Sequence, residues 1–569
     1  MSIFKNLVKY LTKKEYLILT IAVILSLVLA NSISLILPTI IAKIIDEYTV
    51  TQTIATKYYI ITGIALVVGT TFTFLNTYLN AVLGEKIGKD LKDRLFKKVL
   101  KHNYSYLIET KPSKILTVIN SDTIYIKNTF TQAIGMALMA VFLLIGSVIL
   151  MFSLSQKLAL IIIIAAPSII GLLILILKNK FKLFKEVQKL RDKLNKVITE
   201  NIKASMLIKV FVSEKVEIKK FKKVNTKNKL LGLEINKIFA IVVPTINALS
   251  IVATLAILYF GGQEVIYGNM TIGDITAFNN YVGLFTTPLL MLGLMSTMLG
   301  QAFASLGRIN TVLNTPITFK DGTKNIEDFK DLEIKNLSLK IDGTTVLKDI
   351  NYSMKKGQKI GILGLTGSGK TVFLKALLRA LEPTSGEILF NGEDIKDYKI
   401  KDIRKLIGFS FQENFLFNGS IFENIKFGRD IKDNEIFKAA KIAEVDEFAK
   451  KTEKKYNSKV GEQGNNLSGG QKQRVMIARA LASNPDILIL DDATSRLDIE
   501  TEKKVFENIK EEYKDISIIL VAQKIASVKD CDRIYIFDNG HIEESGTHEE
   551  LLKGSVLYQE IELTQRNHG

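Results

Sequence analysis

The chain has 569 residues, of which 47% are hydrophobic and 24% are charged, and its formal net charge is +18. This length allows more than one domain. Its single cysteine, Cys531, excludes structural disulfides and a cysteine-ligated metal cluster. The positive charge by itself is compatible with nucleic-acid binding, so its distribution along the chain decides how it is interpreted.

The first half of the chain contains six runs without Asp, Glu, Lys or Arg. They are residues 17–42, 58–84, 128–156, 158–177, 238–263 and 275–307. A helix needs about 20 apolar residues to cross a membrane. Buried helices of a large soluble protein are also apolar, but six such runs in succession favour a membrane domain. The first run is too long for a secretory signal peptide and no small-residue cleavage pattern follows it. We therefore expect six transmembrane helices.

The connections between these runs differ in charge. Residues 85–127 and 178–237 are dense in lysine, whereas the loops after the first, third and fifth runs are short and poor in Lys and Arg. Positive charge is retained on the cytoplasmic side, so both termini and the second half of the chain are expected to be cytoplasmic. The abundance of Ile, Lys and Asn is typical of an AT-rich bacterial genome, which suggests a multi-pass protein of a bacterial cytoplasmic membrane. This topology explains the net charge without nucleic-acid binding.

The two lysine-rich connections are too long for turns. Apolar residues in the second recur with helical spacing, at Leu183, Val187, Leu190, Leu194, Val197 and Ile198. Helices are therefore expected to project from the membrane into the cytoplasm.

Several polar and soft side chains lie within the predicted spans. The polar ones are Asn31, Asn76, Asn80, Asn247, Asn279, Asn280 and Gln301, and a stripe of Met291, Met295 and Met298 lies near Phe285. Polar groups in spans usually face the bundle interior, where they either line a cavity or bond neighbouring helices. The methionines form either an adaptable ligand surface or ordinary helix packing. Neither pattern identifies a substrate, its contact residues or the direction of movement.

Polar turn residues replace the apolar spans at residues 314–324, which divides the chain into a membrane domain, residues 1–315, and a second domain, residues 325–569. In the second domain, residues 359–363 read as a buried strand and residues 370–381 as a helix. The sequence GLTGSGKT, residues 364–371, lies at their junction. Such a glycine-rich turn lets backbone N–H groups wrap phosphate oxygens. An ordinary glycine turn before a helix is the alternative.

The phosphate-loop interpretation assigns a role to each residue in this turn. Lys370 supplies a charge to the phosphates and Thr371 a hydroxyl ligand for Mg²⁺. The expected ATP contacts are Gly364, Leu365, Thr366, Gly367, Ser368, Gly369, Lys370, Thr371 and Val372. Further along, the apolar run 487–490 ends in Asp491 and Asp492, as expected of a buried parallel strand that delivers carboxylates to its C-terminal edge. Asp491 is expected to hold Mg²⁺ through water.

A third motif, LSGGQ at residues 467–471, completes a set that resembles the ATP-binding cassette (ABC) transporter family. The resemblance extends over nearly the whole chain and implies the ABC exporter fold: an α-helical membrane domain with six transmembrane helices, followed by an α/β P-loop nucleotide-binding domain. In this family two cassettes pair head to tail, and each ATP lies between one phosphate loop and the other chain's LSGGQ. The resemblance therefore implies that the ATP bound by the partner is contacted by Leu467, Ser468, Gly469, Gly470 and Gln471.

The same resemblance assigns other positions. Gln412, in SFQENFLF, matches the Q-loop and joins Thr371 and Asp491 as an Mg²⁺ ligand. Residues 461–464 match the cross-linking loop and Asp498 the D-loop. Residues 201–221 resemble the second intracellular loop, whose coupling helix crosses to the partner's cassette, and residues 259–278 resemble the link from the fifth to the sixth span.

Three positions depart from the family pattern. Hydrolysing members usually have glutamate after the Walker B aspartate, whereas this chain has Asp492; the switch histidine is replaced by Gln523; and Ile341 stands where an aromatic residue often stacks on adenine. A glutamine cannot carry a proton or a positive charge, and misplacing a base by roughly 1 Å can cost about a hundredfold in rate. All three positions serve the chain's own ATP, whereas its LSGGQ is intact.

This distribution of changes resembles the degenerate half of a heterodimeric exporter. The resemblance implies an ATP-driven transporter subunit that exports amphipathic small molecules, lipids or peptides with a non-identical partner half-transporter in the lipid membrane. Two alternatives stay open. One is a homodimeric exporter with slow hydrolysis, and the other is an importing or ATP-gated regulatory membrane protein of the same fold.

Overall fold

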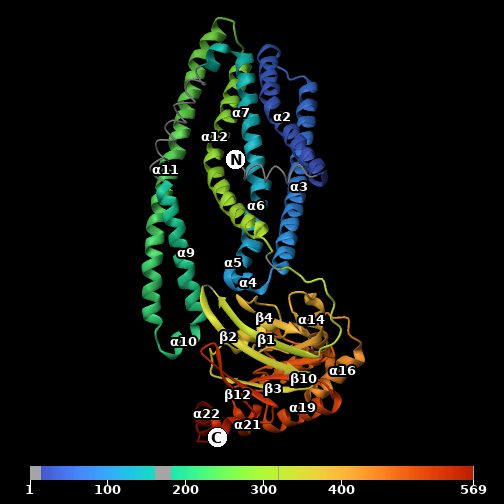
Figure 1. Ribbon diagram of the computed structural model, residues 1–569. Helices are drawn as coiled ribbons and strands as arrows, with labels where there is room; N and C mark the ends of the chain where they lie inside the picture. Colours follow the sequence, from blue (N-terminus) through green and yellow to red (C-terminus); the bar gives the residue numbers. More distant parts are fainter. Residues whose placement is uncertain (1–13, 161–180, 318–319, 342, 568–569) are drawn as a thin grey trace. The chain divides into compact units, whose positions relative to one another are not determined.

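The chain folds into two compact units in a computed structural model that describes residues 14–160, 181–317, 320–341 and 343–567. One unit comprises residues 1–98 and 113–315, and the other comprises residues 99–112 and 316–569. The first unit is helical, and the second combines sheets and helices (Figure 1). The short segment 99–112, which the sequence analysis places in a cytoplasmic connection of the membrane domain, is grouped with the second unit.

The first unit is built from long helices. They are α2 (Lys14–Thr51), α3 (Thr56–Lys101), α5 (Pro112–Thr117), α6 (Thr123–Asn128), α7 (Ile134–Leu154), α9 (Phe181–Lys203), α10 (Ser205–Val210), α11 (Glu214–Ile266) and α12 (Ile272–Asn314), with the π-helical segments η1 (Val118–Asp122) and η2 (Thr129–Ala133). Among the described residues, four helical stretches are long and apolar enough to cross a membrane: Tyr16–Thr51, Thr56–Lys101, Pro112–Leu154 and Glu214–Ile266.

These four stretches contain the first, second, third and fifth predicted runs. The fourth run, residues 158–177, lies almost entirely outside the described residues. The sixth lies within α12, a single helix of 43 residues that is not one of the four. The lysine-rich segment with helical periodicity forms α9 and the start of α11, so this connection is helical, as the spacing of its apolar residues predicts.

Several polar side chains of the spans bond neighbouring helices. Asn76 of α3 donates from Nδ2 to Val23 O of α2 at 2.8 Å. Asn80 donates to Thr131 O at 2.7 Å. Thr131 lies in η2, where the π-helical turn widens the helix. Between α11 and α12, Thr254 Oγ1 donates to Asn279 Oδ1 at 2.8 Å. For these three asparagines, the structure supports the helix-bonding alternative.

A buried ion pair joins the η1 segment to the end of α12. Asp122 is only 1% exposed. Its Oδ1 accepts hydrogen bonds from Ser305 Oγ at 2.9 Å and Arg308 Nη2 at 2.5 Å, and its Oδ2 accepts one from Arg308 Nε at 2.8 Å. A two-point contact between guanidinium and carboxylate is geometrically specific, so this pair holds the two segments in a defined register.

We expect Arg308→Ala to destabilise the first unit by about 3 kcal/mol, because the substitution leaves the Asp122 carboxylate buried without its cation. This is the low end of the range for buried pairs, since the Arg308 side chain is 51% exposed. Unfolding of the full chain by denaturant in detergent micelles measures the change. The double variant Asp122→Asn, Arg308→Gln should recover part of the loss, and equal stability of Arg308→Ala and the parent would contradict the assignment.

The second unit contains two main sheets. The antiparallel sheet has the order β2 (Thr344–Lys355), β1 (Asp331–Ile341), β4 (Ser385–Phe390), β5 (Glu393–Asp394). The six-stranded sheet has the order β12 (His541–Gly546), β11 (Arg533–Asp538), β3 (Lys359–Gly364), β10 (Ser517–Ala522), β9 (Ile487–Asp491), β6 (Ile407–Ser410), and only β12 is antiparallel to its neighbour. A two-stranded sheet pairs β7 (Gly419–Ser420) with β8 (Lys459–Val460).

Helices connect these strands. They are α13 (Lys370–Leu377), α14 (Ile400–Leu406), α15 (Ile421–Lys426), α16 (Asp433–Ile442), α17 (Asp446–Ala449), α18 (Gly469–Leu481), α19 (Ile499–Glu512), α20 (Ile525–Val528), α21 (His548–Gly554) and α22 (Val556–Asn567), with short 3₁₀ turns at Lys455–Asn457 and Glu462–Gly464. In the segment 99–112, α4 (Tyr104–Thr110) places Ile108 against the core that contains β1 and β2.

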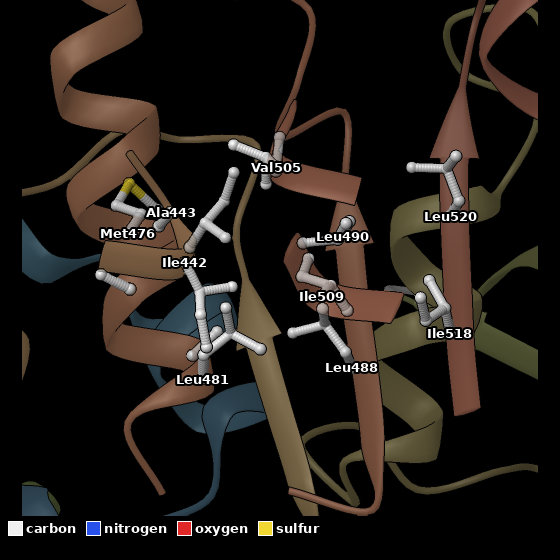
Figure 2. Close-up of a cluster of buried hydrophobic side chains, with 14 of the residues drawn as sticks. Ile442, Ala443, Met476, Leu481, Leu488, Leu490, Val505, Ile509, Ile518 and Leu520 are labelled. Carbon is white, nitrogen blue, oxygen red and sulfur yellow. The ribbon is translucent and has the colours of Figure 1, made fainter. Parts of the chain in front are cut away.

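The six-stranded sheet separates two hydrophobic cores. Successive side chains of a strand point to opposite faces, so Leu488 and Leu490 of β9 enter one core and Ile487 and Ile489 enter the other. In the first core Leu488 and Leu490 pack with residues of α16, α18 and α19, such as Met476 (Figure 2). Burial on both faces explains the unbroken apolar sequence of these strands.

Candidate nucleotide site

Three parallel strands end together at one edge of the six-stranded sheet. Leu363 of β3 lies opposite Ala522 of β10, and Val521 of β10 lies opposite Asp491 of β9. The residues that follow these strands are therefore neighbours in space. They are the glycine-rich turn after β3, Asp492 after β9 and Gln523 after β10.

The glycine-rich turn connects β3 to α13 through close contacts that only glycine allows. A Cβ on Gly364 would lie 2.3 Å from Phe537 O, and one on Gly369 would lie 2.8 Å from Leu347 Cδ2. Gly369 also has φ +102°, a conformation that favours glycine. The turn thus exposes its backbone, as a phosphate-binding loop requires.

The helix after this turn is shorter than its sequence predicts. The apolar pattern suggests residues 370–381, but α13 ends at Leu377. Arg379 takes φ +47° and its buried guanidinium donates to Lys320 O at 3.1 Å. This tertiary contact ends the helix one turn early, and the spacing of apolar residues cannot reveal it.

Lys370 is the first residue of α13, and its side chain reaches back to the start of the turn. Its Nζ donates to the carbonyl oxygens of Gly364 and Leu365, both at 2.7 Å. Burial lowers the pKa of this ammonium, and the carboxylates of Asp491 and Asp492 oppose the change. An ammonium held in this way among backbone carbonyls is poised to bind an anion.

Asp491 faces Thr371 across the site. Thr371 Oγ1 donates to Asp491 Oδ2 at 3.1 Å, and Asp491 is 2% exposed. Burial raises the pKa of Asp491, while the hydrogen bond from Thr371 lowers it. A hydroxyl and a carboxylate at this distance are suitable ligands for Mg²⁺, which takes one or two protein oxygens together with phosphate and water. Consistent with so sparse a ligand set, the described residues contain no group of three or more His, Cys, Asp or Glu side chains that could hold a metal.

Asp492 follows directly and is held in an uncommon backbone conformation, φ +51°. Its N–H donates to Val521 O at 3.1 Å. Burial raises the pKa of its carboxyl, and the hydrogen-bonding Gln412 side chain and the Lys370 charge oppose that change. Asp492 and Gln412 are therefore neighbours in the site.

One pocket brings most of the predicted residues together. It is lined by Val346, Thr366, Gly367, Gly369, Lys370, Thr371, Val372, Gln412, Asp491, Asp492, Val521, Ala522 and Gln523. Gly364, Leu365 and Ser368 belong to the turn but do not line the pocket. Ile341, at the end of β1, is partly buried against the core and also lies outside the lining.

The pocket also contains residues that the sequence analysis did not select. Val346 comes from β2, in the other sheet, and no motif marks it. Val521 and Ala522 are the last residues of β10, so the rule that ligands bind at the carboxyl ends of parallel strands would have found them.

Gln523 is exposed at the rim of this pocket. Its backbone carbonyl accepts a hydrogen bond from Gln565 Nε2 at 2.8 Å, and Gln565 Oε1 accepts one from Ile525 N at 2.9 Å. Gln565 of α22 therefore fixes the turn that presents the Gln523 side chain.

The LSGGQ residues lie at the start of α18 and none of them lines the pocket. Ser468 is the N-cap: its Oγ accepts from Gln471 N at 3.3 Å, and Gln471 Oε1 accepts from Ser468 N at 2.9 Å. This reciprocal capping box satisfies two donors of the first turn. Ser468 is exposed, so the capped helix end is open to a ligand or a partner.

Asp498 has a local structural role in addition to its match with the D-loop. It caps α19, because Oδ1 accepts from Thr501 N at 2.9 Å and Oδ2 from Thr501 Oγ1 at 2.7 Å. These hydrogen bonds lower the pKa of its carboxyl. Residues 461–464 consist of the short 3₁₀ turn Glu462–Gly464 and its N-cap Gly461, and they lie ahead of LSGGQ.

Two family models match the chain. Residues 20–289 match the model described as ABC transporter transmembrane region, and residues 347–495 match the model described as ABC transporter. The chain is 31% identical over 560 residues to the uncharacterized ABC transporter ATP-binding protein YfiB of Bacillus subtilis (strain 168), which covers 97% of each sequence.

Two further comparisons cover most of the chain. The chain is 29% identical over 497 residues to the ATP-dependent lipid A-core flippase of Syntrophus aciditrophicus (strain SB). This alignment covers 87% of this chain and 83% of the flippase. Its fold is similar to a bacterial Atm1-family ABC exporter with ATP bound, with a TM-score of 0.81 and 23% identity over 96% of this chain and 99% of that chain.

Proposed function

The chain belongs to the ATP-binding cassette transporters as a half-transporter of the exporter fold, and from this membership we propose that it is the degenerate-site subunit of a heterodimeric exporter. In this proposal the chain's own site binds ATP and Mg²⁺ but turns ATP over slowly. Its intact LSGGQ completes the site of a partner that carries the glutamate and the histidine. The ATP that stays bound closes the cassette pair, and hydrolysis at the partner's site reopens it.

The observation that carries this proposal is the pocket itself. Asp492 and Gln523, the two departures from the family pattern, line the same pocket as Lys370, Thr371 and Asp491. In this proposal the site retains the residues expected to bind phosphate and Mg²⁺, whereas the side chains expected to activate water are shortened or uncharged. The capping box at Ser468 supports a working signature for the partner's ATP.

Exposed apolar surfaces support a dimer. In and directly after α10, five apolar residues of a lysine-rich segment are exposed: Met206, Leu207, Val210, Phe211 and Val212. On the cassette, four aromatic side chains near Gln412 are exposed: Phe411, Phe415, Phe417 and Phe427. Apolar patches of this kind mark sites of protein interaction. Because residues 201–221 resemble the loop that carries a coupling helix, we propose that the apolar surface in and after α10 binds the partner's cassette.

The transported compound is proposed by class only. The apolar membrane unit suits amphipathic small molecules, lipids or peptides, and one of the relatives is named a lipid A-core flippase. A cytoplasmic location of the cassette is proposed from the lysine-rich connections, and export is proposed from the similarity of the fold to that of an ABC exporter. A homodimer with two slow sites is the alternative that the experiment below distinguishes. An ATP-gated or importing protein of this fold is a further alternative.

The experiment is to purify the chain from its native membrane through a C-terminal tag and to identify stoichiometric partners by mass spectrometry. We expect one non-identical chain of the same architecture, with glutamate after its Walker B aspartate and histidine at the switch position. The same preparation from cells in which that partner is deleted is the control. Recovery of only the tagged and untagged forms of this chain, at equal amounts, would show a homodimer and contradict the proposal.

A further inference from the structure

The first turn of α18 packs directly against the loop that follows Asp492. A Cβ on Gly469 would lie 2.9 Å from Arg496 Cδ, and one on Gly470 would lie 3.0 Å from Arg496 O. The two glycines therefore serve their own chain as well as any ligand, since they let this loop approach the helix backbone. The loop and the helix end form one packed body.

Gln473, one turn further along α18, anchors this loop with both ends of its amide. It is 1% exposed. Its Oε1 accepts a hydrogen bond from Arg496 N at 2.9 Å, and its Nε2 donates to Asp492 O and to Ser495 Oγ, each at 3.3 Å. A buried amide with three partners inside one turn fixes that turn tightly.

The anchored turn begins with Asp492, which stands where hydrolysing members of the family have the glutamate that acts as the base. Asp492 has φ +51°, which costs free energy for a residue with a side chain and persists only where its surroundings hold it. Its N–H is bound to Val521 O, and its carbonyl accepts from Gln473 Nε2 and from Ser495 Oγ at 2.9 Å. The direction in which the Asp492 carboxylate enters the pocket thus depends on Gln473.

We propose that Gln473 is a positioning residue that fixes the backbone conformation of Asp492. As a result, the start of α18, which faces the partner's ATP, and Asp492, which lies beside the chain's own ATP, move as one unit. A shift of the first turn of α18 is passed through the Gln473 amide to Asp492. The inference rests on the proposed function for what each site does, but the linkage itself rests only on contacts within this chain.

The test uses the full chain in lipid and compares Gln473→Leu with Val475→Ala. Leucine has a similar volume but cannot form hydrogen bonds, whereas Val475 is fully buried on the same helix and is not among the residues that bond the loop. The first readout, amide hydrogen exchange by mass spectrometry, needs no turnover. We expect Gln473→Leu to speed exchange in a peptide covering residues 493–497 by about tenfold, as loss of a hydrogen bond predicts, and Val475→Ala to leave it unchanged.

The second readout is turnover in the Asp492→Glu, Gln523→His background, or in the parent if the parent hydrolyses ATP well. We expect Gln473→Leu to lower kcat by about tenfold or more while KM for ATP changes less than threefold. Ser495→Ala, at an exposed position, removes one donor to Asp492 O and should give a smaller fall. Unchanged exchange or an unchanged kcat in Gln473→Leu would each overturn the positioning role, and so would equal losses in Gln473→Leu and Val475→Ala.

The two proposals fail separately. Fast ATP hydrolysis by the unaltered chain would contradict the proposal of a degenerate site. The exchange result for Gln473→Leu would still decide whether Gln473 links α18 to Asp492. Unchanged exchange contradicts the linkage, whatever the turnover of the parent.

Discussion

Replacing Asp492 with Glu and Gln523 with His together is expected to raise the ATPase rate of the chain by about a hundredfold. Glutamate extends the carboxylate by one methylene towards the pocket that Lys370 and Thr371 line, and a base displaced by roughly 1 Å costs about this factor. Histidine adds a side chain able to carry a proton or a positive charge near neutral pH. Steady-state phosphate release from the purified chain in lipid vesicles measures the gain.

The matched control for this variant is Asp492→Asn, Gln523→His, which has the histidine but no carboxylate. It should stay at the rate of the parent, because the gain requires a base. An equal rise in both double variants would show that the carboxylate does not act as the base. No rise in either would show that the chain lacks something other than these two side chains, such as a partner that supplies the opposite LSGGQ.

Removing the charge at Lys370 is expected to weaken ATP binding between tenfold and about a hundredfold. A hydrogen bond to a charged group contributes about 1.5–3 kcal/mol, and Lys370→Ala removes both that contact with phosphate and the bonds that order the carbonyls of Gly364 and Leu365. The pKa of Lys370 is lowered by burial, so a bound anion would also restore favourable surroundings for its charge. Equilibrium binding of a fluorescent ATP analogue to the full chain measures the loss.

Lys356→Ala is the control, since Lys356 is exposed and does not line the pocket. It removes the same charge from the same domain and should leave the affinity unchanged. If Lys370→Ala and Lys356→Ala bind the analogue equally well, the pocket after β3 is not the phosphate site.

The sequence predicts that several of the pocket residues lie close together, because the motifs that contain them are local. GLTGSGKT places a turn between a buried strand and a helix, and the strand that ends in Asp491 must present its carboxylate at the same edge as every parallel neighbour. The length of the uncharged runs likewise predicts long helices in the first unit, since span length follows from membrane thickness.

The remaining features depend on long-range contacts that have no local signal. Arg379 ends α13 early through a carbonyl about sixty residues upstream, that of Lys320. Val346 reaches the pocket from the other sheet, and Gln473 bonds a loop that begins 19 residues further along the chain. The capping of α19 by Asp498 is a different case, because it is local and an aspartate directly before a helix predicts it. The sequence analysis assigned Asp498 only to the D-loop.

The most direct test of the central claim is the ATPase activity of the unaltered chain, purified alone in lipid, beside its Asp492→Asn variant. We predict little ATPase activity in the unaltered chain and the same low rate in Asp492→Asn, together with normal ATP binding in both. Rapid hydrolysis in the parent that Asp492→Asn abolishes would contradict the account, because Asp492 would then be a working base and the chain a self-sufficient pump.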